Sequence, residues 1–300
     1  YYGDNLEVLQ DRAAFPDESV DLIYLDPPFN SNANYSHLFR SPDGKVAQSQ
    51  IQAFEDTWEW GDSANAAFRQ VVTGPNTDVA ELLTSMRRFL RENAMMAYLA
   101  MMAARLVELH RVLKPTGSLY LHCDPTASHY LKLLLDAIFG PENFRNEITW
   151  KRTGVHGDSK TWSKVSDIIF FFTKSAAFVW NDQLQSHSAE YLESHYSKSD
   201  PDGRRYQLTS ILSPSPRPNM MYEWKGFPSP PMGWRFSKAR MAELDAAGLI
   251  WYPTRADGAL DTEKRPRFKR YLDEQQGTKV TTIWTDIAPI NARAQERLGY

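Results

Sequence analysis

The sequence predicts an α/β protein, a sheet with helices on both faces, joined to an inserted region of different character. Apolar strand-like runs alternate with helical patterns as far as residue 180. Beyond about residue 182 the alternation stops, and Pro- and Ser-rich sequence leads into short basic and aromatic pieces. We therefore predict a first domain over 1–181, an inserted region over 182–295, and a return to the first domain at 296–300.

The first elements of the predicted sheet lie before residue 30. Residues 5–14 have a short helical pattern, and the apolar run at 20–25 is typical of a buried strand. Residues 30–80 show little periodicity and much Asn, Ser, Asp and Gly. A connection of that length inside a compact domain favours a functional loop or lid.

The remaining elements follow in order. Residues 82–113 are strongly helical, in two pieces that meet near Glu92 and Asn93, and stop before Pro115. Further elements are a strand at 117–123, a helix at 126–139, strands at 148–150 and 165–173, a returning hairpin strand at 176–180, and a helix at 237–247.

The composition excludes several classes of protein. A chain of 300 residues with 42% hydrophobic and 24% charged residues is ordinary for a globular protein. No apolar run approaches the roughly 20 residues that span a bilayer. A single cysteine excludes an internal disulfide framework and indicates a reducing cytoplasm. The net charge is −3, but the final third has more Lys and Arg than Asp and Glu, as expected of a segment that contacts phosphates.

The sequence Asp26-Pro27-Pro28-Phe29 follows the strand predicted at 20–25. Ligands of open α/β sheets bind at the carboxyl ends of the strands. Two prolines stiffen the turn because each has a fixed φ and no N–H. Such a turn can hold an amino group between a side-chain oxygen and a backbone oxygen while an aromatic ring covers a flat base.

Several blocks of the chain together resemble one family. They are Tyr2-Gly3-Asp4-Asn5, Asp26-Pro27-Pro28-Phe29, Gly117 to Asp124, Asn146 to Arg152, and Glu296 to Tyr300. Their order is similar to that of the beta group of DNA amino-methyltransferases, which includes the modification subunits of type III restriction systems. The resemblance implies a Rossmann-like methyltransferase sheet and makes 1–181 a partial catalytic domain and 182–295 a target-recognition region.

The resemblance also implies a reaction and its partners. The reaction is methyl transfer from S-adenosylmethionine to adenine N6 of duplex DNA, on a nucleotide flipped out of the helix. Asp26, Pro27, Pro28 and Phe29 are then catalytic, and Asp4, Asn5 and Asp26 contact the cofactor. Asp4 is equally suited to cap a helix. The implied partners are DNA, a second copy of the chain and a restriction subunit. The alternatives are cytosine-N4 methylation and a truncated, non-catalytic DNA-binding fragment.

The densest basic and aromatic cluster lies near residue 268. Its basic members, expected to contact DNA phosphates, are Arg265, Arg267, Lys269 and Arg270. Three tryptophans nearby either pack a small core or wedge into DNA, and the core is favoured: Trp224, Trp234 and Trp251.

The run His122-Cys123-Asp124 contains three residue types that bind metals. Adjacent strand residues point to opposite faces, and zinc sites need wider spacing, so we expect no metal here. Asp124-Pro125 is typical of a cap and turn that opens a helix. Cys123 does not match a cytosine-C5 methyltransferase nucleophile, because those enzymes place proline before the cysteine.

The glycine-rich cofactor loop of the family, of the type Phe-x-Gly-x-Gly, has no counterpart, since no Gly-x-Gly occurs in 1–300. In the beta group that loop follows the Leu-Gly-Tyr segment, which here is residues 298–300. We therefore expect a chain truncated at both ends that binds S-adenosylmethionine weakly or not at all by itself.

Overall fold

A computed structural model describes residues 4–27, 34–36, 52–55, 58–154 and 160–289. The chain divides into two compact units. The first contains Tyr1–Asn181 and Thr281–Tyr300, and the second contains Asp182–Val280. The compact second unit therefore ends at Val280, earlier than the predicted return at 296, because the segment after it pairs with the sheet of the first unit.

The first unit is built on a five-stranded mixed sheet of order β1-β4-β6-β5-β13. Strand β1 (Val20–Leu25) runs parallel to β4 (Leu113–Cys123), and β6 (Ser166–Thr173) runs antiparallel to β4. Strand β5 (Phe144–Lys151) pairs antiparallel with β6 and parallel with β13 (Ile283–Trp284). The α/β fold class is confirmed.

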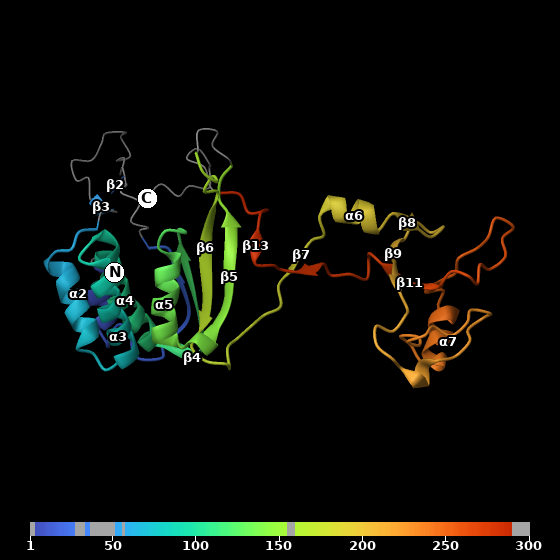
Figure 1. Ribbon diagram of the computed structural model, residues 1–300, viewed down its shortest axis with the longest axis horizontal. Coiled ribbons are helices and arrows are strands. Elements are labelled where there is room, and N and C mark those ends of the chain that lie inside the picture. The colour runs from blue at the N-terminus through green and yellow to red at the C-terminus, as the bar shows by residue number, and fades with distance from the viewer. Residues whose placement is uncertain (1–3, 28–33, 37–51, 56–57, 155–159, 290–300) are drawn as a thin grey trace. The chain divides into compact units, whose positions relative to one another are not determined.

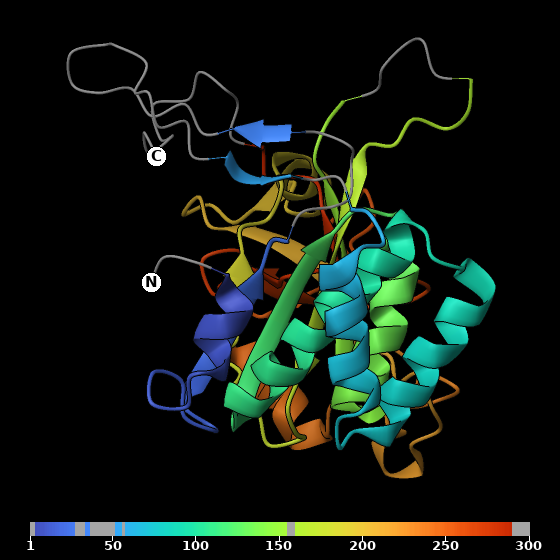
Figure 2. The same ribbon diagram turned by 90° about the vertical axis from the view of Figure 1, so that its left-hand side faces the viewer.

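Helices cover one face of this sheet (Figures 1 and 2). They are α2 (Asp62–Val72), α3 (Thr77–Leu90), α4 (Ala94–Val112) and α5 (Ser128–Phe139), and α1 (Asn5–Gln10) packs on α4. Alternate strand residues, including Ile23, Leu119, Leu121, Phe170 and Phe172, enter the core under the helices. Each fully buried side chain of this kind stabilises the fold by roughly 1.5–3 kcal/mol.

The other face of the sheet has no helix among the described residues of this unit, so helices are seen on one face rather than two. On β1 this face carries Leu22 and Tyr24, which are 61% and 59% exposed. Over β6, Phe171 is instead buried, because Phe178 and Trp180 pack on its ring. The predicted hairpin strand at 176–180 is therefore wrong. This segment packs by its rings, forms no strand of the sheet, and makes one backbone hydrogen bond to β4, from the amide of Val179 to the carbonyl of Thr116 at 3.2 Å.

Of two further predictions for the first unit, the helix at 82–113 is confirmed and the long loop at 30–80 is not. The two-piece helix at 82–113 is confirmed, since α3 and α4 are separate helices and Asn93 caps the second. The interval 30–80 is not a single loop, because it contains α2, which buries Ala64, Ala67 and Phe68. It also contains the short paired strands β2 (Asn34–Ser36) and β3 (Gln52–Glu55).

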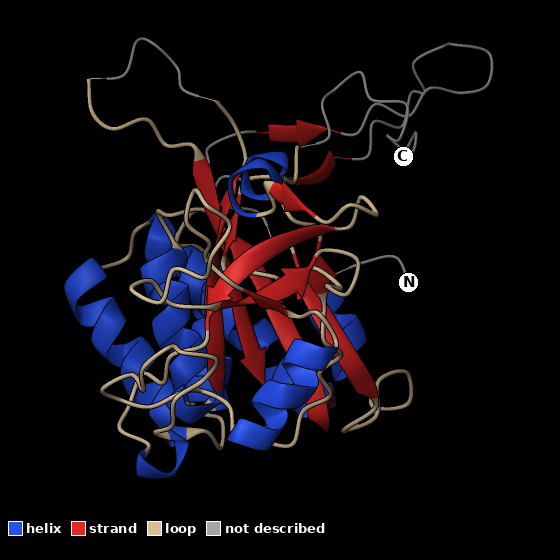
Figure 3. Ribbon diagram, turned by 90° about the vertical axis from the view of Figure 1, so that its right-hand side faces the viewer, coloured by secondary structure: helices blue, strands red, loops and turns tan. Residues whose placement is uncertain are grey.

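The second unit has short elements joined by long loops, drawn in tan in Figure 3. Its main sheet has the order β10-β11-β9-β8. These strands are β8 (Lys198–Ser199), β9 (Arg205–Ser210), β10 (Ile250–Trp251) and β11 (Arg267–Tyr271). A small core packs against α7 (Lys238–Ala246) through Met241 and Leu244. Other elements are α6 (Ala189–His195) and the pair β7 (Leu184–Gln185) and β12 (Thr278–Lys279).

No helix among the described residues has the length and apolar character needed to cross a membrane.

The two 3-10 turns among the described residues, Pro141–Asn143 and Pro218–Met220, each begin with a proline, whose fixed φ suits the first position of a helical turn.

Candidate active site

Asp26 follows the last residue of β1, at the carboxyl end of the parallel pair β1 and β4. Leu25 pairs with Leu121, so Asp26 lies level with His122 of β4. The Asp26 side chain is 61% exposed, and its Oδ1 lies 2.9 Å from His122 Nδ1. Of the predicted catalytic tetrapeptide, Asp26 and Pro27 are described, whereas Pro28 and Phe29 lie outside the described residues.

The imidazole of His122 continues this contact into the protein. It is 8% exposed, and its Nε2 lies 3.3 Å from Oδ2 of Asp167, a β6 residue that is 1% exposed. Arg152, just after β5, forms an ion pair with the same Oδ2 at 2.7 Å. Asp26, His122, Asp167 and Arg152 therefore form one charged network across the strand ends.

The charged network lies on the sheet face opposite the helices. Cys123 enters the core under the helices, so its neighbour His122 points to the other face, as alternation in a strand requires. His122 pairs with Ile169, and Asp167 lies two residues further along β6, on the same face. The ring of Trp150 on β5 packs edge-on against the imidazole at 5.7 Å.

The surroundings of His122 determine its protonation. Burial lowers its pKa, but hydrogen bonds to Asp167 and Asp26, with the charges of both carboxylates, outweigh burial and raise the pKa to about 9. His122 is therefore an imidazolium at neutral pH and donates from both nitrogens. Sequence reasoning missed this role, because the partners lie 96 and 45 residues away along the chain.

The predicted cofactor-binding residues Asp4 and Asn5 lie at the start of α1. Asp4 caps the helix, since its Oδ1 accepts from the amide of Leu6 at 2.8 Å. Arg105 of α4 donates to both Asp4 oxygens, at 2.7 and 3.0 Å, and to Asn5 Oδ1 at 2.7 Å. The helix-cap interpretation is confirmed, and the cofactor contact stays a prediction.

Cys123 and Asp124 have structural roles. Cys123 is fully buried, and burial is the largest of the causes that raise the pKa of its thiol. A buried, protonated thiol is a poor nucleophile. Asp124 accepts hydrogen bonds from the amides of Thr126 and Ala127, both at 3.1 Å, which confirms the predicted turn before α5. The predicted cap is wrong, because α5 begins at Ser128 and its N-cap residue is Ala127. Among the described residues, no group of three His, Cys, Asp or Glu is arranged to hold a metal ion.

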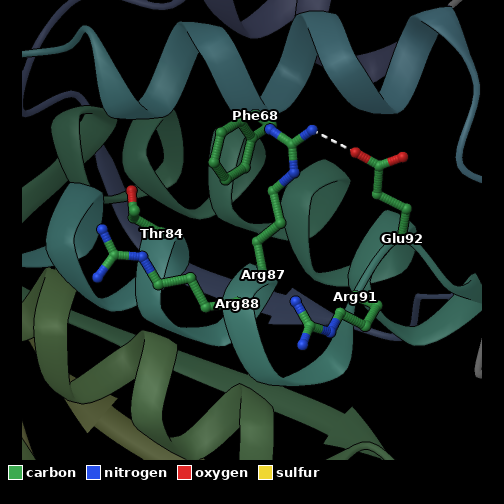
Figure 4. Close-up of a pocket in the computed structure, with 6 residues that line it drawn as sticks. All are labelled: Phe68, Thr84, Arg87, Arg88, Arg91 and Glu92. Atoms are coloured by element: carbon green, nitrogen blue, oxygen red, sulfur yellow. Dashed lines mark hydrogen bonds and ion pairs between the residues drawn. The ribbon is translucent and has the colours of Figure 1, made fainter.

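Two of the cavities formed by described residues lie in the first unit. One of about 510 Å³ runs along β1 beside α1 and is lined by Asn5, Val8 and the strand residues Leu22 to Leu25. The other, of about 600 Å³, is shown in Figure 4 and is lined by Phe68, Thr84, Arg87, Arg88, Arg91 and Glu92. In it Arg87 pairs with Glu92 and stacks on Phe68, whereas neither Asp26 nor Pro27 contributes to its wall.

The four basic residues predicted to bind DNA differ in their surroundings. Arg267 is exposed, and with Arg265 it lines a cavity of about 610 Å³ that includes Trp251. Lys269 is instead ion-paired to Asp200 at 2.7 Å, with both side chains less than 20% exposed. Arg270 is exposed but points to the opposite face of β11, as alternation requires.

The three tryptophans singled out in the second unit also differ in burial. Trp234 is fully buried and Trp224 is 8% exposed, so both belong to the small core, as the favoured interpretation predicted. Trp251 is half-buried, with Lys198 Nζ 5.8 Å from the centre of its ring.

Comparison with known proteins places these features in a family. The model of the N6/N4 family described as DNA methylase matches residues 20–298. The type II methyltransferase M.EcaI of Enterobacter cloacae is 31% identical over 208 residues, which are 68% of this chain and 44% of that protein. The type III restriction-modification enzyme StyLTI Mod subunit of Salmonella typhimurium is 26% identical over 297 residues, 95% of this chain and 40% of that subunit. The chain thus spans less than half the length of these relatives.

A solved structure was also matched, that of the PvuII DNA methyltransferase (cytosine-N4-specific), with a TM-score of 0.33 and 12% identity. It covers 64% of this chain and 60% of that chain. This structural similarity is too low to assign a family, so the assignment rests on the sequence match over residues 20–298. That range contains all four residues of the charged network. The chain therefore belongs to the N6/N4 DNA methylase family and is similar to type III modification subunits.

Proposed function

We propose that the protein transfers a methyl group from S-adenosylmethionine to the N6 amino group of adenine in duplex DNA. The observation that carries this proposal is the position of Asp26. It is an exposed carboxylate at the carboxyl end of β1, with the rigid Pro27 directly after it and a buried histidine holding one of its oxygens. Asp at the first position of the tetrapeptide favours adenine over cytosine within the family.

The chemistry requires acceptors rather than a nucleophile. The lone pair of the adenine amino group is delocalised into the ring, so the nitrogen attacks poorly. Hydrogen bonds from its two N–H groups to a carboxylate oxygen of Asp26 and to the Pro27 carbonyl draw the nitrogen toward a tetrahedral geometry. This mechanism depends on positioning and electrostatics and needs no covalent enzyme intermediate.

The target base must leave the duplex to reach this turn. A base stacked inside a helix cannot place its amino group beside a strand-end carboxylate, so the mechanism requires base flipping. Unstacking and unpairing cost a few kcal/mol. Stacking on an aromatic ring, worth about 1–3 kcal/mol per base in single-strand systems, offsets part of that cost. Phe29 is the residue assigned to this stacking, by resemblance.

The first unit offers residues that fit a nucleoside cofactor. The cavity along β1 has mostly apolar lining residues and includes Asn5, and the carboxylate of Asp4 at the start of the same helix is 44% exposed. Asp4 and Asn5 would hold the adenosine part, with Arg105 fixing both side chains, and Asp26 would lie next to the methyl group. When bound, S-adenosylmethionine supplies an electrophilic methyl group on sulfur.

The second unit supplies candidate DNA contacts. Arg267, Lys264 and Trp251 line one cavity, which combines positive charge with an aromatic ring. Arg270 is a candidate for phosphate contact on the other face of β11. Among the four basic residues predicted from the sequence to bind DNA, Lys269 is the weakest candidate, because its ion pair with Asp200 already neutralises its charge.

The test is tritiated methyl transfer to DNA by the full-length protein, followed by nucleoside analysis. We expect N6-methyladenine as the product and loss of transfer in Asp26→Ala. Asp21→Ala is the matched control, since Asp21 is an exposed β1 carboxylate that pairs only with Lys114 among the described residues. N4-methylcytosine as the sole product would overturn the adenine assignment. DNA binding without transfer would favour the non-catalytic alternative.

A further inference from the structure

The exposed position of Asp26 raises the question of what orients it. A carboxylate that is 61% exposed in a turn can rotate about two side-chain torsions. Catalysis by hydrogen-bond acceptance requires one fixed orientation, since a misplacement of about 1 Å can cost about 10²-fold in rate. The contact from His122 Nδ1 to Asp26 Oδ1, at 2.9 Å, is the interaction that can fix it.

The imidazole itself is held from several sides. Its Nε2 contacts Asp167, which is almost completely buried and is bound in turn by Arg152 at 2.7 Å. The ring of Trp150 limits its tilt. The backbone is held from both sides, because His122 pairs with Ile169 of β6 and the preceding Leu121 pairs with Leu25 of β1.

We propose that His122 is a positioning residue for the reaction assigned to Asp26. It donates from Nδ1 to Oδ1 of Asp26 and thereby leaves Oδ2 to accept from the amino group of the target base. This inference rests on the proposed function and adds a residue to it. His122 acts only through Asp26 and contacts neither the base nor the methyl group.

The surroundings of His122 favour positioning over proton transfer. Among the described residues, the carboxylates that contact it are Asp26 after β1 and Asp167 on β6, and Arg152 after β5 forms an ion pair with Asp167. With a pKa of about 9, the imidazole is already protonated at neutral pH and cannot take up the proton that the amino group releases. That proton leaves through Asp26 or solvent.

Two isosteric substitutions separate the two ends of the imidazole. The amide nitrogen of Asn occupies the place of Nδ1, so His122→Asn keeps a donor for Asp26 and loses the contact to Asp167. The amide of Gln reaches the place of Nε2, so His122→Gln keeps the contact to Asp167 and leaves Asp26 unheld. Both variants are neutral, and each is therefore the control for the loss of charge in the other.

The experiment measures kcat, KM and DNA affinity for both variants of the full-length protein. We expect His122→Gln to lower kcat about 10²-fold and His122→Asn to lower it less than about 10-fold, with DNA affinity unchanged in both. Equal kcat values for the two variants, or a lower kcat for His122→Asn, would overturn the proposal.

A second measurement needs no activity. The chain has seven histidines, and ¹⁵N-histidine NMR with His122→Asn as the assignment control follows the His122 ring alone. We expect Asp26→Asn to lower the pKa of His122 from about 9. If Asp26→Asn leaves that titration unchanged, the contact is absent and the inference fails. If the wild-type protein shows the shift but methylates no DNA, the proposed function fails and the contact stands.

Discussion

Nδ1 of His122 lies 2.9 Å from Oδ1 of Asp26, although 96 residues separate the two in the chain. The contact joins the end of β1 to the buried part of β4 and links an exposed carboxylate to an ionic interaction inside the sheet. It follows directly from the parallel register of β1 and β4, which brings Asp26 level with His122.

The protonation of His122 makes stability depend on pH. Its folded-state pKa of about 9 lies above the ordinary value of 6.5, so its contribution is fully present below pH 6.5 and is lost as pH rises to about 9. We expect this contribution to be roughly 1–3 kcal/mol, reduced by the exposure of Asp26. Urea unfolding at pH 6 and pH 9.5 measures it. A pH dependence that is unchanged in His122→Asn would contradict the assignment.

Arg105 holds α1 against α4 through Asp4 and Asn5. Substituting Arg105→Met removes its donors while keeping a long apolar stem, so we expect a loss of about 1–2 kcal/mol in the free energy of unfolding. Arg12→Met is the control, because Arg12 pairs with Asp17 on an exposed surface and should cost less than about 0.5 kcal/mol. Denaturant unfolding measures both, and equal effects would show that the Arg105 contacts do not stabilise the fold.

Lys269 and Arg267 lie on the same face of β11 but should respond differently to substitution. Lys269→Gln leaves the partly buried Asp200 without its ion pair, although Tyr271 still donates to it, so we expect stability to fall by about 1–3 kcal/mol. Arg267→Gln should leave stability unchanged. We expect it to weaken DNA binding and reduce the slope of log K against log salt by about 1. Thermal unfolding and DNA titrations at several salt concentrations separate these effects, and destabilisation by Arg267→Gln would count against the assignment.

The two tryptophans of the second unit give a matched pair. Trp234 is fully buried and donates from Nε1 to the Tyr222 carbonyl, so Trp234→Ala should destabilise by about 3–5 kcal/mol. Trp251 is half-buried beside Lys198 and Arg267, so Trp251→Ala should cost less than about 2 kcal/mol and weaken DNA binding. Stability and DNA affinity are measured for both. The assignment fails if Trp251→Ala unfolds the unit or leaves DNA binding intact.

Much of the first unit could be predicted from local sequence. The strand at 20–25 was found to the residue, because its apolar run is bounded by a turn on one side and by Asp26-Pro27 on the other. Helix α2 was missed although Ala64, Ala67, Phe68 and Val71 are spaced along one helical face, because this face covers only 11 residues within an interval rich in Asn, Ser, Asp and Gly. The buried face packs against α4, a contact that the local sequence does not reveal.

The candidate site was predicted only in part for a similar reason. Asp26 and Pro27 were found because their context is local, at the end of one strand. The roles of His122 and Asp167 depend on the register between β4 and β6, which sequence alone did not supply. The ion pair of Lys269 was missed because Asp200 comes from a distant turn, whereas the composition of the basic cluster is visible locally.

The charged network has a further electrical consequence. Its two carboxylates are matched by an imidazolium and a guanidinium at 2.7–3.3 Å, so the group carries no net charge. The electric field of neighbouring opposite charges decays faster with distance than the field of a lone ion. At an ionic strength of about 0.1 M, salt also screens charges that are more than about 10 Å apart. An approaching phosphate backbone would therefore meet little long-range repulsion from Asp26, while a base in direct contact would still find a full carboxylate oxygen.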